Sequence, residues 1–236
     1  MQAIILAGGL GTRLKSVVAD KPKVLSPVAG KPFLYYIIQY LQEQGITSYI
    51  FSLGYLANQV IDFLQETYPN LPYQYCIEET PLGTGGGIKK AMELSTEQNV
   101  LIVNADTYFN ISLPQMYTAH EATEAMCSVS LKLLNDFDRY GSVEIDTYNT
   151  IVSFKEKVFT KQGFINGGYY IINKKYFISE TQHLPEIFSF EKDFLERKLS
   201  TNMVKGFVAD GYFIDIGIPE DYAKAQEVFA DKTVIN

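Results

Sequence analysis

Residues 4–13 read IILAGGLGTR, and residues 21–25 follow as KPKVL. The short apolar run predicts a buried strand that ends in glycines. Glycines let backbone N–H groups approach a polyphosphate, and the start of a following helix or turn adds its positive end. Arg13 and Lys23 supply further positive charge. This order of parts predicts a phosphate cradle at a strand end, so we expect a nucleotide as ligand.

Two common phosphate-binding motifs do not match this stretch. A dinucleotide-binding fingerprint needs GxGxxG, and a P-loop needs GxxxxGK followed by Ser or Thr, whereas the order here is GGxGTR. Three glycines alone are equally compatible with a plain turn between a strand and a helix. The cations that follow favour phosphate binding.

A wider part of the sequence resembles a known enzyme family. GGLGTRL at 8–14 and KPKVLSPVAGKP at 21–32 are similar to the patterns GGxGTRL and PKxLxPVxGKP of the sugar-1-phosphate nucleotidylyltransferases. Further segments follow in the family's order: PLGTGG at 81–86, VNAD at 103–106, FKEK at 154–157, NGG at 166–168 and DIGIPEDY at 215–222. They span nearly the whole chain, and within the family they most resemble the bacterial D-glycero-α-D-manno-heptose 1-phosphate guanylyltransferases.

Composition narrows the class of protein. The 236 residues are 47% hydrophobic, enough for the core of one α/β domain, and no linker or repeat divides them. We therefore expect a single catalytic domain over 1–236.

The net charge of −7 argues against nucleic-acid and anionic-membrane partners, since both need a basic face. Two cysteines without metal-like spacing and an N-terminus unlike a signal peptide favour the cytoplasm.

Strand and helix signals alternate in the first half of the chain. Strands are expected at 2–7, 49–53, 73–77 and 100–103, and helices at 32–44, 58–67, 85–94 and 114–124, with Pro32 at a first helical position and Asn58 as an N-cap. Strands at 126–134, 141–145, 150–156 and 164–172, a strand pair at 203–208 and 212–216, and a helix from Pro219 follow. We expect an α/β fold: a Rossmann-like, mainly parallel (mixed) sheet with helices on both faces and ligands at the carboxyl ends of its strands. This is also the nucleotidyltransferase core that the resemblance implies.

The resemblance implies a reaction in which a sugar 1-phosphate oxygen attacks the α-phosphorus of a nucleoside triphosphate and pyrophosphate leaves. Asp106 and Asp215, each at the end of an apolar run, are the carboxylates expected to bind Mg²⁺. Aspartates often serve turns instead, and here the family pattern favours metal binding. The departures from that pattern, Asn104-Ala105 and Ile218, leave both carboxylates in place.

The resemblance also implies roles for residues that bind the phosphates, the nucleotide and the sugar. Arg13 is expected to bind the β- and γ-phosphates, Lys23 the α-phosphate or the same polyphosphate, and Lys157 the sugar phosphate, although most lysines are simply solvated. The catalytic set is thus Arg13, Lys23, Asp106 and Lys157. The nucleotide-binding set adds Leu6, Ala7, Gly8, Gly9, Gly11, Thr12, Glu78, Gly83 and Thr84, and the substrate-binding set is Asn104, Gly141, Glu156, Lys157, Asn166 and Gly167.

Glu78 is a candidate residue for recognising the base of the nucleoside triphosphate. An ionised carboxylate only accepts hydrogen bonds. Guanine offers N1–H and N2–H₂ side by side, whereas uracil and thymine offer one N–H, so Glu78 favours GTP. Glu79 or backbone groups are alternative readers of the base.

Alternative functions stay open from sequence alone. Hexose and N-acetylmuramic acid 1-phosphate enzymes that use UTP, dTTP or CTP compete with the heptose assignment. The family also includes nucleotide-binding regulatory subunits without turnover, but such a subunit would be expected to lose a phosphate-binding cation or a metal carboxylate, and this sequence retains both kinds of residue. A homo-oligomer is compatible with the sequence.

Overall fold

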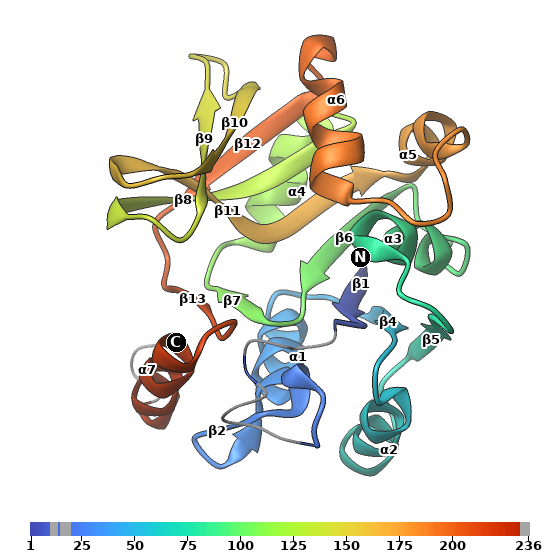
Figure 1. Ribbon diagram of the computed structural model, residues 1–236. Coiled ribbons are helices and arrows are strands. Elements are labelled where there is room, and N and C mark those ends of the chain that lie inside the picture. Colours follow the sequence, from blue (N-terminus) through green and yellow to red (C-terminus); the bar gives the residue numbers. More distant parts are fainter. Residues whose placement is uncertain (10–13, 15–19, 232–236) are drawn as a thin grey trace.

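The computed structural model describes residues 1–9, 14 and 20–231, and its centre is a mixed β-sheet (Figure 1). Within these residues nine strands pair in one sheet, in the order β10-β9-β11-β6-β1-β4-β5, and β8 joins β11 to β12. The neighbouring strands β6 (Asn99–Asn104), β1 (Gln2–Ala7), β4 (Ser48–Leu53) and β5 (Tyr73–Ile77) are parallel. Helices separate them along the chain, as predicted.

Helices cover both faces of this sheet (Figure 1). Ile5 packs in an apolar cluster with side chains of α1 (Phe33–Glu43), α2 (Ala57–Thr67), α4 (Leu113–Ala122) and α7 (Pro219–Ala230). Its neighbour Ile4 packs in a second cluster with α3 (Gly83–Met92) and α5 (Lys174–Thr181). Successive side chains of a strand point to opposite faces, so β1 supplies both clusters. The predicted Rossmann-like mixed sheet with helices on both faces is confirmed.

Antiparallel strands extend the sheet in the second half of the chain. β11 (Thr160–Asn173) pairs antiparallel with β6, β8 (Cys127–Phe137) and β9 (Gly141–Ile145). β10 (Ile151–Lys157) then pairs antiparallel with β9. The four predicted strands of this region are therefore present, with ends shifted by up to four residues.

The predicted terminal strand pair is wrong. β12 (Val204–Ala209) adds parallel to β8. β13 (Phe213–Asp215) instead pairs antiparallel with β7 (Thr107–Phe109) in a separate small sheet. The two C-terminal strands thus have different partners, and β13 lies beside the residues that follow β6.

Helix starts also differ from the prediction. α1 begins at Phe33 rather than Pro32, because β3 (Lys31–Pro32) pairs with β2 (Pro27–Val28). α2 begins after Leu56, which has a φ of 56°, so Asn58 lies inside the helix and does not cap it. The helical segments that the sequence did not predict are α5, the π-helix η2 (Phe190–Leu195), α6 (Glu196–Lys198), and the 3-10 turns η1 (Lys23–Leu25) and η3 (Leu199–Thr201). Among the described residues, the helices include none long and apolar enough to cross a bilayer.

Candidate active site

Two chambers open at the carboxyl ends of the parallel strands. The first, called here the β5–α3 chamber, has a volume of about 460 Å³ and is lined by Leu6, Gly8, Gly9, Glu78, Pro81, Gly83, Thr84, Gly87, Asn104 and Asp106. The second, the β9–β10 chamber, has a volume of about 500 Å³ and is lined by residues of β7, β9, β10, β11, η2 and β13. Asn104 and Asp106 line both. The chambers therefore meet just after β6, at the edge where open α/β sheets bind ligands.

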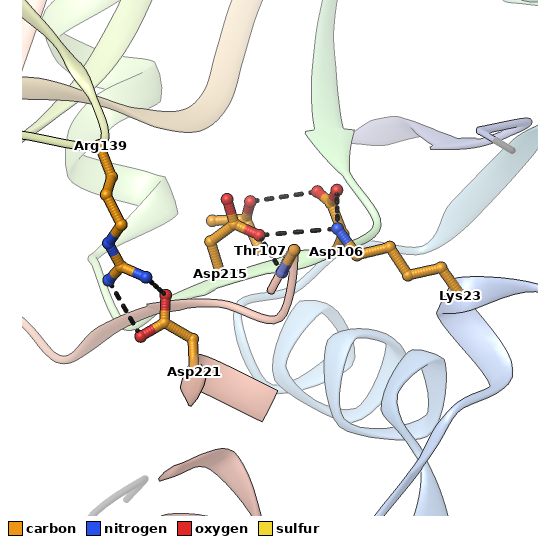
Figure 2. Close-up of polar contacts among 7 residues, drawn as sticks. Lys23, Asp106, Thr107, Arg139, Asp215 and Asp221 are labelled. Atoms are coloured by element: carbon orange, nitrogen blue, oxygen red, sulfur yellow. Dashed lines mark hydrogen bonds and ion pairs between the residues drawn. The ribbon is translucent and has the colours of Figure 1, made fainter. Parts of the chain in front are cut away.

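Asp106 and Asp215 come together at this junction, although they lie far apart in the sequence. The β13–β7 ladder places Asp215 opposite Thr107. Figure 2 shows the Lys23 side chain reaching both acids: its Nζ lies 2.6 Å from Asp106 Oδ2 and 3.7 Å from Asp215 Oδ1. Thr107 Oγ1 donates to Asp106 Oδ1 at 3.3 Å, and the Gly217 N–H donates to Asp215 Oδ1 at 2.6 Å. The structure thus gathers two carboxylates and one ammonium group at the point shared by the chambers.

The two carboxylates are the groups at this junction that could hold a cation. Burial raises the pKa of Asp215, and the negative charge of Asp106 raises it further, whereas the Lys23 ammonium lowers it. Close like charges are relieved by a positive ion between them, and their oxygens are the ligands that Mg²⁺ prefers. Over the described ranges, groups of three or more His, Cys, Asp or Glu that could hold a metal are absent. A Mg²⁺ ion here would therefore take its other ligands from phosphate and water.

Glu78 projects into the β5–α3 chamber from the end of β5. Its Oε1 accepts a hydrogen bond from Ser52 Oγ at 3.1 Å, and its Oε2 accepts one from the Leu82 N–H at 2.9 Å. A Cβ at Gly87 would lie 2.8 Å from Oε1, so a glycine is needed there for the carboxylate to take this position. Glu79, the other candidate reader of the base, is exposed.

The first turn of α3 is held against the segment that leads into η2. Gly83 has a φ of 72°, and a Cβ there would lie 2.6 Å from the Phe188 carbonyl oxygen, so both its conformation and its contact require glycine. Thr84 Oγ1 donates to Glu191 Oε2 at 3.0 Å and accepts from the Phe190 N–H at 2.9 Å. The hydroxyl of Thr84 is thus directed at η2.

The β9–β10 chamber contains most of the predicted sugar-binding residues. Gly141, Glu156, Lys157 and Asn166 all line it, and Lys157 lies opposite Gly141 in the β9–β10 ladder. Gly167 is the exception: it packs against a phenylalanine, with a would-be Cβ only 2.5 Å from the Phe109 ring. The neighbouring residue Gly168 lines the chamber instead.

A profile of the nucleotidyl transferase family matches residues 2–232. The chain belongs to this family. The transferase is 48% identical over 227 residues, 96% of its length and 97% of the relative's, to D-glycero-α-D-manno-heptose 1-phosphate guanylyltransferase of Aneurinibacillus thermoaerophilus. It is 43% identical, over 94% of its length and 97% of the relative's, to the enzyme of the same name from Campylobacter jejuni. The crystal structure of HddC from Yersinia pseudotuberculosis complexed with GMP-PN superposes with a TM-score of 0.85 at 40% identity, covering 97% of this chain and 99% of that chain.

Ala7, a predicted nucleotide-binding residue of the transferase, lines neither chamber. Ala7 is buried in the core at the end of β1, at 4% exposure. Gly11, Thr12 and Arg13 lie outside the described residues. The likeness to the family, which the motifs predicted, is confirmed for the chain as a whole, whereas the role of each site residue stays a prediction.

Sequence reasoning missed a large part of the transferase's β9–β10 chamber. The additional lining residues are Thr107, Tyr140, Ser142, Val143, Phe154, Lys155, Tyr170, Ser189, Glu191, Lys192, Glu196 and Phe213. Several could have been found from their position beside a predicted residue, as Tyr140 precedes Gly141. The η2 residues carried no such signal, because no local pattern places that segment near the strand ends.

An ion pair between Arg139 and Asp221 connects the β8–β9 turn to the start of α7, the helix that follows Asp215. Arg139 Nη1 lies 2.9 Å from Asp221 Oδ2, and Arg139 Nη2 lies 3.1 Å from Asp221 Oδ1 (Figure 2). Arg139 precedes the chamber residues Tyr140 and Gly141, and Asp221 lies in the first turn of α7, after Asp215. Two contacts between the guanidinium and the carboxylate, one of them a hydrogen bond, fix orientation as well as distance. The pair therefore ties the β8–β9 turn to the segment that carries Asp215.

Proposed function

We propose that this transferase moves GMP from GTP to D-glycero-α-D-manno-heptose 1-phosphate and releases pyrophosphate. The observation that carries the proposal is the match to two enzymes named for that substrate, at 48% and 43% identity over 97% of each relative. The HddC complex with GMP-PN supports a guanine nucleotide as the partner.

The two chambers suit the two substrates. We assign the β5–α3 chamber, which contains Gly8 and Gly9, to the nucleotide and the β9–β10 chamber to the sugar 1-phosphate. A phosphate monoester has a second pKa of ~6, so the attacking oxygen is mostly ionised at neutral pH and needs no general base. That oxygen forms a bond to the α-phosphorus while the bond from this phosphorus to the pyrophosphate oxygen breaks, and the electron pair leaves with pyrophosphate.

The catalytic residues then act on charge and position. Asp106 and Asp215 would hold one Mg²⁺, which when bound neutralises phosphate charge. Lys23, whose ammonium lies beside both carboxylates, is assigned to the polyphosphate. Lys157 is assigned to the sugar phosphate and Arg13 to the leaving β- and γ-phosphates. Preorganised cations at the point where charge develops lower the barrier to transfer.

Base and sugar are read by different parts of the site. Glu78 is assigned to the guanine edge, because its carboxylate lies inside the β5–α3 chamber while Glu79 is exposed. Glu156, Asn166 and the backbone at Gly141 are assigned to the sugar hydroxyls, since carboxylate and amide groups pair with vicinal hydroxyls.

We further propose that residues 1–236 act as a single catalytic domain. A nucleoside triphosphate substrate agrees with the cytoplasmic location that the sequence predicts. Turnover is favoured over a regulatory, binding-only role because Lys23, Asp106 and Asp215 converge on one point.

A pyrophosphate-release screen tests the proposal. GTP, UTP, dTTP and CTP are each combined with the 1-phosphates of D-glycero-α-D-manno-heptose, mannose, glucose and N-acetylmuramic acid, in the presence of Mg²⁺. We expect the highest kcat/KM for GTP with the heptose 1-phosphate. A higher value for another pair would replace the assigned substrates, and no turnover with any pair would favour the binding-only role.

A further inference from the structure

A hydrogen-bonded cluster connects the two chambers through η2. Glu191 lies in the first turn of this π-helix and lines the β9–β10 chamber. Its Oε2 accepts from Thr84 Oγ1, a residue of the β5–α3 chamber, at 3.0 Å and from Ser189 Oγ at 3.2 Å. Its Oε1 accepts from Tyr170 OH, a residue of the β9–β10 chamber, at 3.4 Å. One carboxylate therefore contacts a side chain of each chamber.

Tyr170 carries this connection to the Asn166 amide in the β9–β10 chamber. The Tyr170 side chain is buried, with 1% of the residue exposed, and its hydroxyl oxygen accepts from Asn166 Nδ2 at 2.8 Å. Asn166 thus donates to the oxygen, and the hydroxyl proton is left for Glu191. Burial, and then the Glu191 carboxylate, hold the pKa of Tyr170 well above its ordinary value, so the hydroxyl keeps the proton it donates.

Thr84 carries the connection to the other chamber. Its hydroxyl donates to Glu191 and accepts from the Phe190 N–H at 2.9 Å, so its position is set by η2 from both sides. The Gly85 N–H also donates to the Phe188 carbonyl oxygen at 3.0 Å. The first turn of α3, on the nucleotide side, is therefore held by the same segment that forms one wall of the sugar-side chamber.

We propose that Glu191 is a positioning residue that sets the relative placement of the two substrates. Through Tyr170 it holds Asn166 at the sugar 1-phosphate, and through Thr84 it holds the first turn of α3 at the nucleotide. This inference rests on the proposed function of the two chambers. In-line transfer depends on the distance and angle between two separately bound anions, so one group that orients both binding surfaces affects both Michaelis constants.

A double-mutant cycle separates this role from a merely structural one. Glu191→Ala removes every contact of the carboxylate and is expected to raise the KM for the sugar 1-phosphate about tenfold, as for the loss of ~1.4 kcal/mol of binding. Its KM for GTP rises as well. Tyr170→Phe removes the hydroxyl and raises only the sugar KM. Because Glu191 acts on the sugar through Tyr170, adding Glu191→Ala in the Tyr170→Phe background changes the sugar KM less than about twofold further.

Controls keep the experiment decisive. Glu186→Gln changes an exposed carboxylate near the same wall and is expected to leave both KM values unchanged. Glu191→Gln replaces Glu191→Ala if the alanine variant does not fold, since an amide cannot accept hydrogen bonds on both sides at once. Additive effects of the two substitutions on the sugar KM, or wild-type KM values in the Glu191 variant, would overturn the proposal. The cycle uses whichever sugar 1-phosphate the wild-type transferase prefers, so an error in the assigned sugar changes the substrate and leaves this test intact.

Discussion

The backbone N–H of Ile216 donates a hydrogen bond to the carbonyl oxygen of Asp106 at 3.0 Å. This main-chain bond continues the β13–β7 ladder, in which Asp215 lies opposite Thr107. The backbone therefore holds the Asp106 and Asp215 carboxylates near one another independently of Lys23. If Lys23 turns toward a bound phosphate, this main-chain bond keeps the two acids near one another, as the proposed metal site requires.

Replacing either acid by its amide should stop the reaction without unfolding the protein. Asp106→Asn and Asp215→Asn keep the side-chain size but remove the charge that attracts Mg²⁺. We expect pyrophosphate release to fall roughly 100-fold or more, the scale of losing a metal-binding group, with little change in melting temperature. Asp138→Asn, at an exposed position of the β8–β9 turn, is the matched control. Near-normal turnover in both variants would remove the metal assignment.

Glu78→Gln should change the choice of base. Each carboxylate oxygen of Glu78 already accepts one hydrogen bond, from Ser52 and Leu82, and a carboxylate has roughly four acceptor sites. The remaining sites match the two N–H groups of guanine, so the KM for GTP should rise about tenfold and the KM for the other nucleotides should change less. Glu79→Gln serves as the control. A loss confined to Glu79→Gln, or an equal loss for all four nucleotides, would show that Glu78 does not read the base.

Arg139→Gln should affect substrate binding more than stability. The Arg139 side chain is 47% exposed, so its ion pair with Asp221 is worth no more than about 1 kcal/mol to folding. The same pair ties the turn before Gly141 to the segment that carries Asp215, so we expect the KM for the sugar 1-phosphate to rise about fivefold. Initial rates and urea unfolding measure the two effects. The charge-swapped variant Arg139→Asp/Asp221→Arg should recover part of the binding, and its failure to do so would argue against a positioning role.

His120 should make stability depend on pH below neutrality. The residue is 1% exposed, its Nδ1 lies 2.9 Å from Ser128 Oγ, and burial lowers its pKa from 6.5 to about 4. Between about pH 6.5 and pH 4, His120 is therefore protonated in the unfolded chain but neutral in the folded chain. The contribution of the neutral residue to the free energy of unfolding is fully present above about pH 6.5 and falls by roughly 3 kcal/mol as the pH drops to about 4.

The His120→Gln variant isolates this contribution. Other titrating groups are common to both proteins, so urea unfolding between pH 7 and pH 4 should show a smaller loss of stability in the variant than in the wild type. If the free energy of unfolding fell equally with pH in the two proteins, His120 would have to be protonated in the folded state.

The sequence predicts the parallel strand–helix units because their signals are local. Each apolar run of the first half ends in a glycine or polar residue, and the order of motifs placed Asp106 at a strand end. The partner of a strand is not a local property, and this is why the pairing of the two C-terminal strands was wrong. Glu191 was missed for the same reason, since tertiary packing alone brings η2 to the chambers.

Solving the transferase with Mn²⁺ and a non-hydrolysable GTP analogue tests whether Asp106 and Asp215 hold the metal ion of the nucleotide. Mn²⁺ takes the same oxygen ligands as Mg²⁺ and is identified by its anomalous scattering. We expect one ion within about 2.2 Å of a carboxylate oxygen of each residue and of a phosphate oxygen, with Lys23 turned toward the phosphates. An ion bound to the triphosphate but remote from both carboxylates would contradict the assignment.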